Sequence, residues 1–246
     1  MQLTTDPGVF PPSPPPSTTD PTVIAAHDWA AFAAVQKMTN HWDRPGWTEH
    51  TRAYYWMLTL PEDAPLVGHM QQCQHALASL RFDDIAADGL HLTLGRIGLV
   101  EDVTAGHLDR LAAAAQGRAP ERFTLRAIPL AASRGAIRYS VAPWTPLINL
   151  HQMLGAVGAE SGLPFRKPSA LLRPHIGLAY ANRPLPADQV RAALRPLRDL
   201  DTVGVPFQQL HLVELRREGR AYRWRTVHSV NLTPAQGNSP LHGQPA

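Results

Sequence analysis

Two histidines open short apolar segments whose residue types could support acid–base chemistry. His91 is the first residue of His-Leu-Thr-Leu, and His175 is the first residue of His-Ile-Gly-Leu-Ala-Tyr. Because side chains alternate between the two faces of a β-strand, His91 shares a face with Thr93, and His175 shares a face with Gly177. Two histidines presented in this way can meet across a cleft. One would then act as general base and the other as general acid on a phosphodiester.

Other chemistries have no matching pattern in this chain. A zinc site uses three or four ligands at recognisable spacing, such as His-Glu-x-x-His, and no such spacing occurs. Cys73 is the only cysteine, which excludes an internal disulfide and a cysteine-based zinc site, while a nucleophilic Cys–His pair stays open. No glycine-rich phosphate loop is present. We therefore expect no metal and no cofactor.

The elements that would position the histidines follow from hydrophobic periodicity. Strands are predicted at 51–60, 89–99, 121–130, 135–142, 174–181, 206–216 and 221–232. Helices are predicted at 23–38, 64–80, 104–116, 144–160 and 187–198. The order helix, histidine-bearing strand, helix occurs twice, which predicts two related lobes. Runs of strands without strict βαβ alternation favour an α+β fold with antiparallel sheets.

Composition sets the limits of the folded part. Residues 1–22 are rich in proline, serine and threonine and are predicted to form a disordered tail. Residues 23–235 would form one two-lobed domain, and residues 236–246 a second disordered tail. A proline-rich tail can also serve as a ligand for a partner protein, which is a further interpretation.

The charge and the targeting signals point to a soluble protein. The 246 residues carry a formal net charge of +3, a mild basic bias that is compatible with an anionic substrate. The sequence shows no signal peptide and no apolar run long enough to span a membrane, and it has a single cysteine. We expect a cytoplasmic monomer with no membrane partner.

At the two histidine motifs the chain resembles the 2H phosphoesterase superfamily, whose signature is a pair of His-x-Ser/Thr motifs. The likeness is strongest to bacterial, especially actinobacterial, 2′-5′ RNA ligase family proteins. It extends over about residues 40–232 and includes the segments 40–47, 143–146 and 222–226.

The resemblance implies a bilobal α+β fold of the LigT-like kind, with two pseudo-symmetric antiparallel sheets and outer helices around a central cleft. It further implies metal-independent chemistry on 2′,5′-phosphodiesters or 2′,3′-cyclic phosphates of nucleotides or RNA ends. His91 and His175 would be the catalytic pair, and Thr93 the hydroxyl of the first motif. The expected partner is an RNA terminus or a small nucleotide.

The second motif departs from that pattern, because Gly177 stands where the family usually has serine or threonine. The loss of one hydrogen-bond donor to the phosphate would cost about 1–3 kcal/mol of transition-state stabilisation, roughly 5–150-fold in rate. Two alternatives follow: an RNA- or nucleotide-binding protein with weakened catalysis, and a phosphoesterase for another small cyclic phosphate.

Three further residues are candidates for substrate binding. Arg173 shares strand parity with His175 and could supply charge, whereas Arg96 has the opposite parity from His91 and is expected outside the cleft. Tyr54 and Trp56 share one face of the strand at 51–60, so they could stack on a base. The sequence does not decide between this face and the one that carries Tyr55.

Overall fold

A four-stranded antiparallel sheet carries the first histidine motif. In this computed structural model, which describes residues 2–234, the strand order is β11-β10-β2-β4. The strands are β2 (Arg52–Thr59), β4 (His91–Leu99), β10 (Gln209–Glu218) and β11 (Ala221–Asn231). His91 is therefore the first residue of an edge strand.

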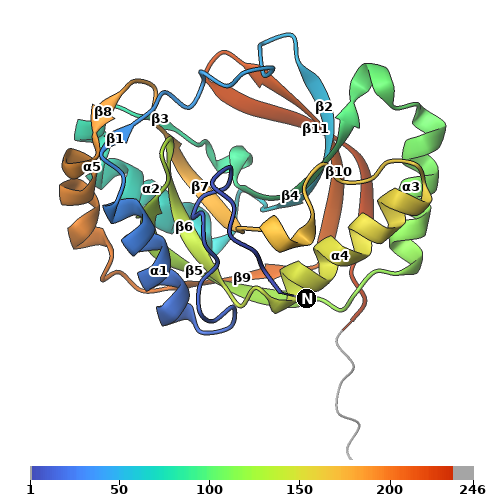
Figure 1. Cartoon of the computed structure of the whole chain (residues 1–246), viewed down its shortest axis with the longest axis horizontal. Helices are drawn as coiled ribbons and strands as arrows, with labels where there is room; N and C mark the ends of the chain where they lie inside the picture. Colours follow the sequence, from blue (N-terminus) through green and yellow to red (C-terminus); the bar gives the residue numbers. More distant parts are fainter. Residues whose placement is uncertain (1, 235–246) are drawn as a thin grey trace, which may run out of the picture.

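A five-stranded antiparallel sheet carries the second motif, in the order β3-β7-β6-β5-β9. Its strands are β3 (Asp83–Asp84), β5 (Phe123–Ala132), β6 (Ala136–Ala142), β7 (His175–Tyr180) and β9 (Val203–Phe207). Figure 1 shows this sheet on the left and the four-stranded sheet on the right, with β4 and β7 meeting between them. The expected α+β fold with two antiparallel sheets is confirmed.

Helices cover both sheets. The α-helices are α1 (Pro21–Ala33), α2 (Pro65–Ala76), α3 (Ala105–Gly117), α4 (Thr145–Glu160) and α5 (Ala187–Leu194). α3 packs on β11, and α4 packs on β4 and α3. α1 and α2 cover opposite faces of the five-stranded sheet, because Asp28 of α1 bonds to Ser140 of β6 while His69 of α2 bonds to Tyr139.

Short elements complete the fold. A two-stranded sheet pairs β1 (Lys37–Met38) with β8 (Leu185–Pro186), so the helix that the sequence predicts over 23–38 ends early. Single-turn 3₁₀ helices occupy Ala78–Leu80, Ala87–Gly89, Val100–Asp102, Ser169–Leu171 and Arg195–Leu197. None of the helices among residues 2–234 combines the length and the apolar character that a bilayer crossing requires.

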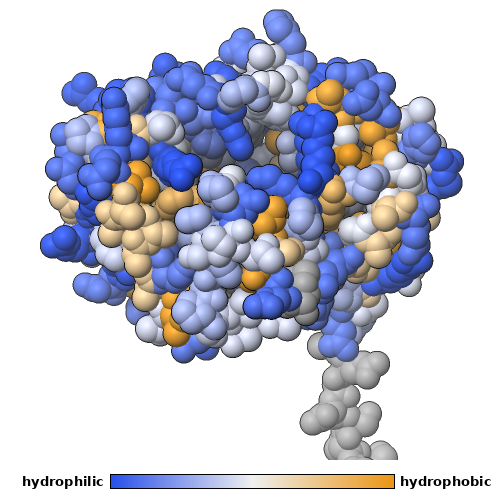
Figure 2. Space-filling view, in the orientation of Figure 1, coloured by the Kyte–Doolittle hydropathy of each residue, from blue (hydrophilic) through white to orange (hydrophobic). Residues whose placement is uncertain are grey.

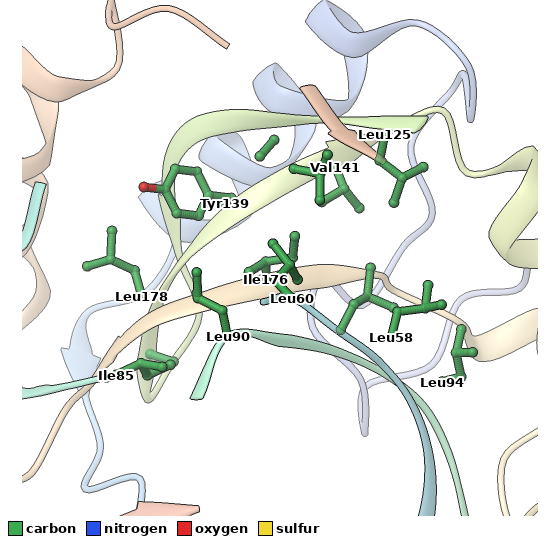
Figure 3. Close-up of a cluster of buried hydrophobic side chains, with 14 of the residues drawn as sticks. Leu58, Leu60, Ile85, Leu90, Leu94, Leu125, Tyr139, Val141, Ile176 and Leu178 are labelled. Carbon is green, nitrogen blue, oxygen red and sulfur yellow. The ribbon is translucent and has the colours of Figure 1, made fainter. Parts of the chain in front are cut away.

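The apolar residues of both histidine motifs form the core behind the site. Leu92 and Ile176 are fully buried, whereas Thr93 is exposed and Gly177 is partly exposed. Figure 3 shows Leu94, Ile176 and Leu178 gathered in this core with side chains from neighbouring strands. The alternation that the sequence predicts is therefore present, and it places the histidines on the opposite side from the core.

The N-terminal segment 2–20 differs from the expected disordered tail. It lies against the five-stranded sheet, as Figure 1 shows in dark blue in front of β6 and β7. The amide of Thr4 donates to the carbonyl of Ala170 at 3.0 Å, and the amide of Trp144 donates to the carbonyl of Thr18 at 2.7 Å. Main-chain hydrogen bonds and only two apolar side chains on the core, Leu3 and Phe10, hold this segment, which is why its composition does not reveal it. The predicted tail at 236–246 lies outside the described residues.

Candidate functional site

The same backbone contact holds the rings of His91 and His175. His91 Nδ1 lies 2.9 Å from the carbonyl oxygen of Gly89, and His175 Nδ1 lies 2.9 Å from the carbonyl oxygen of Arg173. In both cases the acceptor belongs to the residue two places before the histidine. Because a carbonyl oxygen can only accept, each Nδ1 carries a hydrogen. In the neutral ring, Nε2 is then left with a free lone pair.

The two histidine strands lie side by side, since β4 contacts β7 where the two sheets meet. Figure 2 shows a hollow on this face of the molecule, above the place where β4 and β7 meet in Figure 1. Hydrophilic residues make up most of its rim. His175 is exposed and His91 is partly exposed, so solvent reaches both side chains.

Both histidines favour the neutral form in the free protein. Desolvation by the surrounding protein lowers the pKa of His91, although the bond to Gly89 opposes this shift. Desolvation, followed by the charge of Arg138 and that of His91, lowers the pKa of His175 to about 3. His175 is nevertheless exposed to solvent, so a substrate can reach its ring. A bound phosphate anion between the rings would raise both pKa values.

Aromatic rings line the His91 side of the cleft. The ring centroid of Trp224 lies 5.3 Å from that of His91, in an edge arrangement. The segment 39–51 bridges the two sheets above the site, because the amide of His41 donates to Ala181 and its ring contacts the Tyr222 hydroxyl at 3.0 Å. These aromatic groups provide surfaces on which a base can stack.

Tyr54 and Trp56, which we expected as stacking residues, lie elsewhere. Both lie on the face of β2 opposite to Met57, which pairs with Thr93, and Trp56 is fully buried in the main core there. The opposite face of β2 carries Tyr55, which packs against Trp47 at 6.0 Å between centroids. The prediction was wrong because both faces of β2 are apolar, and only the packing of the sheets decides which face lies over the core.

Arg173, which we expected to bind substrate, instead has a structural role in holding the N-terminal segment. It is 8% exposed, and its guanidinium donates to the carbonyls of Pro11, Thr4 and Pro12 at 3.0, 2.7 and 3.3 Å. It also donates to the carbonyls of Leu172 and Ala170. β7 begins at His175, so the strand parity on which this prediction rested does not reach back to residue 173.

Arg96 lies on the cleft face, which corrects the expectation from strand parity. In the pairing of β2 with β4, Met57 faces Thr93 and Trp56 faces Gly95, so Leu94 has no partner. This β-bulge shifts the alternation by one residue, and Arg96 pairs with Tyr55 on the same face as Thr93. A signal was present in the sequence, because Leu94 and Ile97 are both apolar and lie three positions apart.

Cations gather around Tyr55 at this end of the cleft. Burial raises the pKa of the Tyr55 hydroxyl, and the charges of Arg96, Arg44 and Arg166 oppose that rise. Arg44 is exposed, and its guanidinium lies 3.5 Å from the Tyr222 hydroxyl. Arg166 follows Phe165, whose ring lies against Gly95 of the bulge. These three guanidinium groups can attract an anionic substrate.

Neither Cys73 nor a metal-binding group forms a second active site in the described part of the chain. Cys73 Sγ lies 3.7 Å from His69 Nδ1, but burial raises the pKa of the thiol, and a nucleophilic cysteine needs the opposite shift. Within residues 2–234, no three histidine, cysteine, aspartate or glutamate side chains form a group that could hold a metal ion. Two cavities of about 490 and 700 Å³ lie beside α1 and beside β9, away from the histidine pair.

Comparisons with known proteins identify a family for the sequence and related folds for the structure. The model of the 2′-5′ RNA ligase superfamily matches residues 61–219. E. coli LigT complexed with 3′-AMP is 20% identical, with a TM-score of 0.52, and the match covers 75% of this chain and 99% of that one. A protein from Thermus thermophilus is 18% identical with a TM-score of 0.55, covering 74% and 98%. At these identities the likeness shows the fold. No curated protein matches the sequence.

Proposed function

Because the chain belongs to the 2′-5′ RNA ligase superfamily of 2H phosphoesterases, we propose that it is a metal-independent phosphodiesterase. Its substrates would be 2′,3′-cyclic phosphates or 2′,5′-phosphodiesters of nucleotides or RNA ends. The observation that carries the proposal is the matched pair of histidines, each with Nδ1 on a main-chain carbonyl and Nε2 left to react.

The mechanism follows from the two protonation states of that pair. One neutral ring takes a proton from water at Nε2 as the water oxygen attacks phosphorus. The other ring, as imidazolium, gives its Nε2 proton to the leaving ribose oxygen as the P–O bond breaks. By microscopic reversibility, the two rings exchange these roles in the reverse reaction. The exposed Thr93 hydroxyl, on the His91 face, would donate to an oxygen of the transition state.

Three arginines and Trp224 would hold the parts of the substrate that lie away from the reacting phosphate. The charges of Arg44, Arg96 and Arg166 all act on Tyr55, so the phosphate groups of a nucleotide or an RNA end would lie at that end of the cleft. Trp224 would contact the base or the ribose next to His91. E. coli LigT, which shares the fold, has been crystallised with 3′-AMP, which supports a ligand of that class for this cleft.

The test uses the full chain with 2′,3′-cyclic nucleotides and 2′,5′-linked dinucleotides. We expect His91→Ala and His175→Ala each to reduce kcat by about 10²–10⁴-fold, because each removes a proton-transfer group. EDTA should leave the rate of the wild-type protein unchanged. His75→Ala, at an exposed position of α2, is the matched control. Near-normal activity of either site variant, with circular dichroism unchanged, would end the acid–base assignment.

Gly177 favours a second candidate, a nucleotide-binding protein with little turnover. The strand β7 offers no side-chain hydroxyl two residues after its histidine, unlike β4. This candidate predicts that 3′-AMP binds to the wild-type protein while no substrate of the panel is hydrolysed. A panel that includes small non-nucleotide cyclic phosphates separates it from a phosphoesterase of different specificity.

A further inference from the structure

The two histidine strands repeat one irregularity. In β4, Leu94 has no partner between the pairs formed by Thr93 and Gly95. In β7, Gly177 pairs with Arg138 and Ala179 pairs with Ile137, so Leu178 has no partner on β6. The bulge therefore falls three residues after the histidine in both strands. It brings the fifth residue after each histidine onto the cleft face, which is Arg96 in one strand and Tyr180 in the other.

The Tyr180 hydroxyl reaches back along β7 toward the motif. An added Cβ at Gly177 would lie 3.8 Å from the Tyr180 hydroxyl oxygen. The hydroxyl thus occupies the neighbourhood in which a serine or threonine at position 177 would present its own oxygen. Thr93 supplies such a hydroxyl in the first motif, and in the second motif only Tyr180 supplies one.

Three aromatic contacts fix the ring of Tyr180. It stacks on His41 with a centroid distance of 4.1 Å and an interplanar angle of 25°. The rings of Trp42 and Tyr222 make edge contacts with it, with centroid distances of 5.1 and 5.5 Å. A ring held on three sides keeps its hydroxyl in one place, so a hydrogen bond to a ligand would cost little conformational entropy.

The hydroxyl of Tyr180 is free to bind a ligand. No residue between 2 and 234 forms a hydrogen bond with it, whereas the Tyr139 hydroxyl is bonded to His69 and the Tyr222 hydroxyl to His41. It is not among the unpartnered polar atoms that the described part of the chain seals from solvent. Burial and the neighbouring Tyr222 raise the pKa of Tyr180, so the group keeps its proton near neutral pH.

We infer that Tyr180 is a further catalytic residue, whose hydroxyl donates a hydrogen bond to the substrate phosphate in place of the hydroxyl that Gly177 lacks. This inference rests on the proposed function, because it assumes that a phosphate lies between the two histidines. It assigns the β4 side of the phosphate to Thr93 and the β7 side to Tyr180.

The first test is Tyr180→Phe, which removes the hydroxyl and keeps the ring. A donor that acts mainly in the transition state should lower kcat by about 10²-fold with a small change in KM. The loss should be constant from pH 6 to pH 9, because the hydroxyl does not titrate in that range. Tyr139→Phe is the matched control, since it removes a hydroxyl from the opposite face of the adjacent strand, and its kcat should equal that of the wild type.

The second test restores a hydroxyl at position 177. A Cβ at that position would lie 2.7 Å from Ile85 Cδ1, so Ile85→Val, which removes that methyl, is combined with Gly177→Ser. In the Tyr180→Phe background this pair should recover at least tenfold of the lost kcat. Gly177→Ala with Ile85→Val adds the Cβ without the oxygen and should recover nothing.

The outcomes separate the two proposals. If the wild type hydrolyses the panel and Tyr180→Phe remains within twofold of it, the role of Tyr180 is overturned while the phosphodiesterase stands. If the wild type hydrolyses nothing, the proposed function fails. Calorimetric binding of 3′-AMP then tests Tyr180 alone, because its doubly charged phosphate resembles the transition state more than a singly charged cyclic ester does. About tenfold weaker binding by Tyr180→Phe supports the contact, and equal binding overturns it.

Discussion

Main-chain carbonyl groups, rather than side chains, set the tautomers of His91 and His175. Each Nδ1 bonds to the carbonyl two residues upstream, so the turn into the strand sets the orientation of the ring. No carboxylate is needed to hold either ring, in contrast to catalytic triads in which an acidic side chain orients the histidine. A substitution of nearby acidic residues should therefore leave the pair in place.

At the residue scale, the lowered pKa values of both histidines predict an acidic optimum. The general acid must be protonated and the general base neutral, so kcat/KM follows a bell between the two pKa values of the free enzyme. Both values lie below 6.5. The optimum is therefore expected below pH 6.5, and kcat/KM should fall about tenfold per pH unit on the alkaline side. Initial rates between pH 4 and 9 at constant ionic strength check this, and an optimum above pH 7.5 would contradict it.

At the element scale, regular strands were predictable and their irregularities were not. The alternation around His91 and His175 identified both strands and the cleft face of Thr93 and Gly177. The alternation placed Arg96 on the wrong face of β4, because a bulge at Leu94 reverses which side chains face the cleft after it. A bulge depends on how two strands pair, so a single strand read alone shows only a weak trace of it.

The N-terminal segment shows a second limit at this scale. Its prolines and serines indicated disorder, because they offer no apolar face. The structure holds the segment through main-chain carbonyls that accept from Arg173 and Arg138, residues that lie more than a hundred positions away in the chain. Such contacts have no local pattern. Because these contacts cannot be seen in the sequence, Arg173 was predicted to bind substrate.

Arg173→Ala is predicted to loosen this segment. It leaves the carbonyls of Pro11, Leu172 and Thr4 without a donor, at a cost of about 3 kcal/mol in the free energy of unfolding. The His175 contact should survive, because the carbonyl of residue 173 remains. Urea denaturation measures the stability, and limited proteolysis should cut within residues 2–20 sooner than in the wild type. Arg195→Ala, at an exposed position, serves as the control. Unchanged stability and proteolysis would refute this role of Arg173.

At the scale of the whole molecule, buried neutral histidines predict acid sensitivity. Desolvation lowers the pKa of His151 to about 4, and desolvation together with the charge of Arg44 lowers the pKa of His41 to about 3. The unfolded chain binds protons at these positions below pH 6.5, while the folded chain does not. Stability is thus complete above pH 6.5 and falls as the pH drops toward 4, by up to about 1.4 kcal/mol per pH unit for each histidine.

Urea denaturation at pH 7 and pH 5 checks this prediction. His151 is 3% exposed and bonds through Nδ1 to the Ser169 hydroxyl at 2.7 Å. Replacement of His151 by glutamine removes one titrating group, so the variant should be less stable than the wild type at pH 7 but should lose less stability on acidification. Equal acid sensitivity of the two proteins would exclude His151 as a source.

The two sheets do not correspond to the two halves of the sequence. β2 and β4 come from the first hundred residues, and β10 and β11, which complete their sheet, come from the last forty described residues. During synthesis, the edge of β2 that pairs with β10 therefore stays unpaired until residues 209–218 have left the ribosome. The surroundings of His91, including Trp224, are therefore assembled after both histidine strands, and a chain that stops before residue 209 would carry both histidines yet lack the wall beside His91.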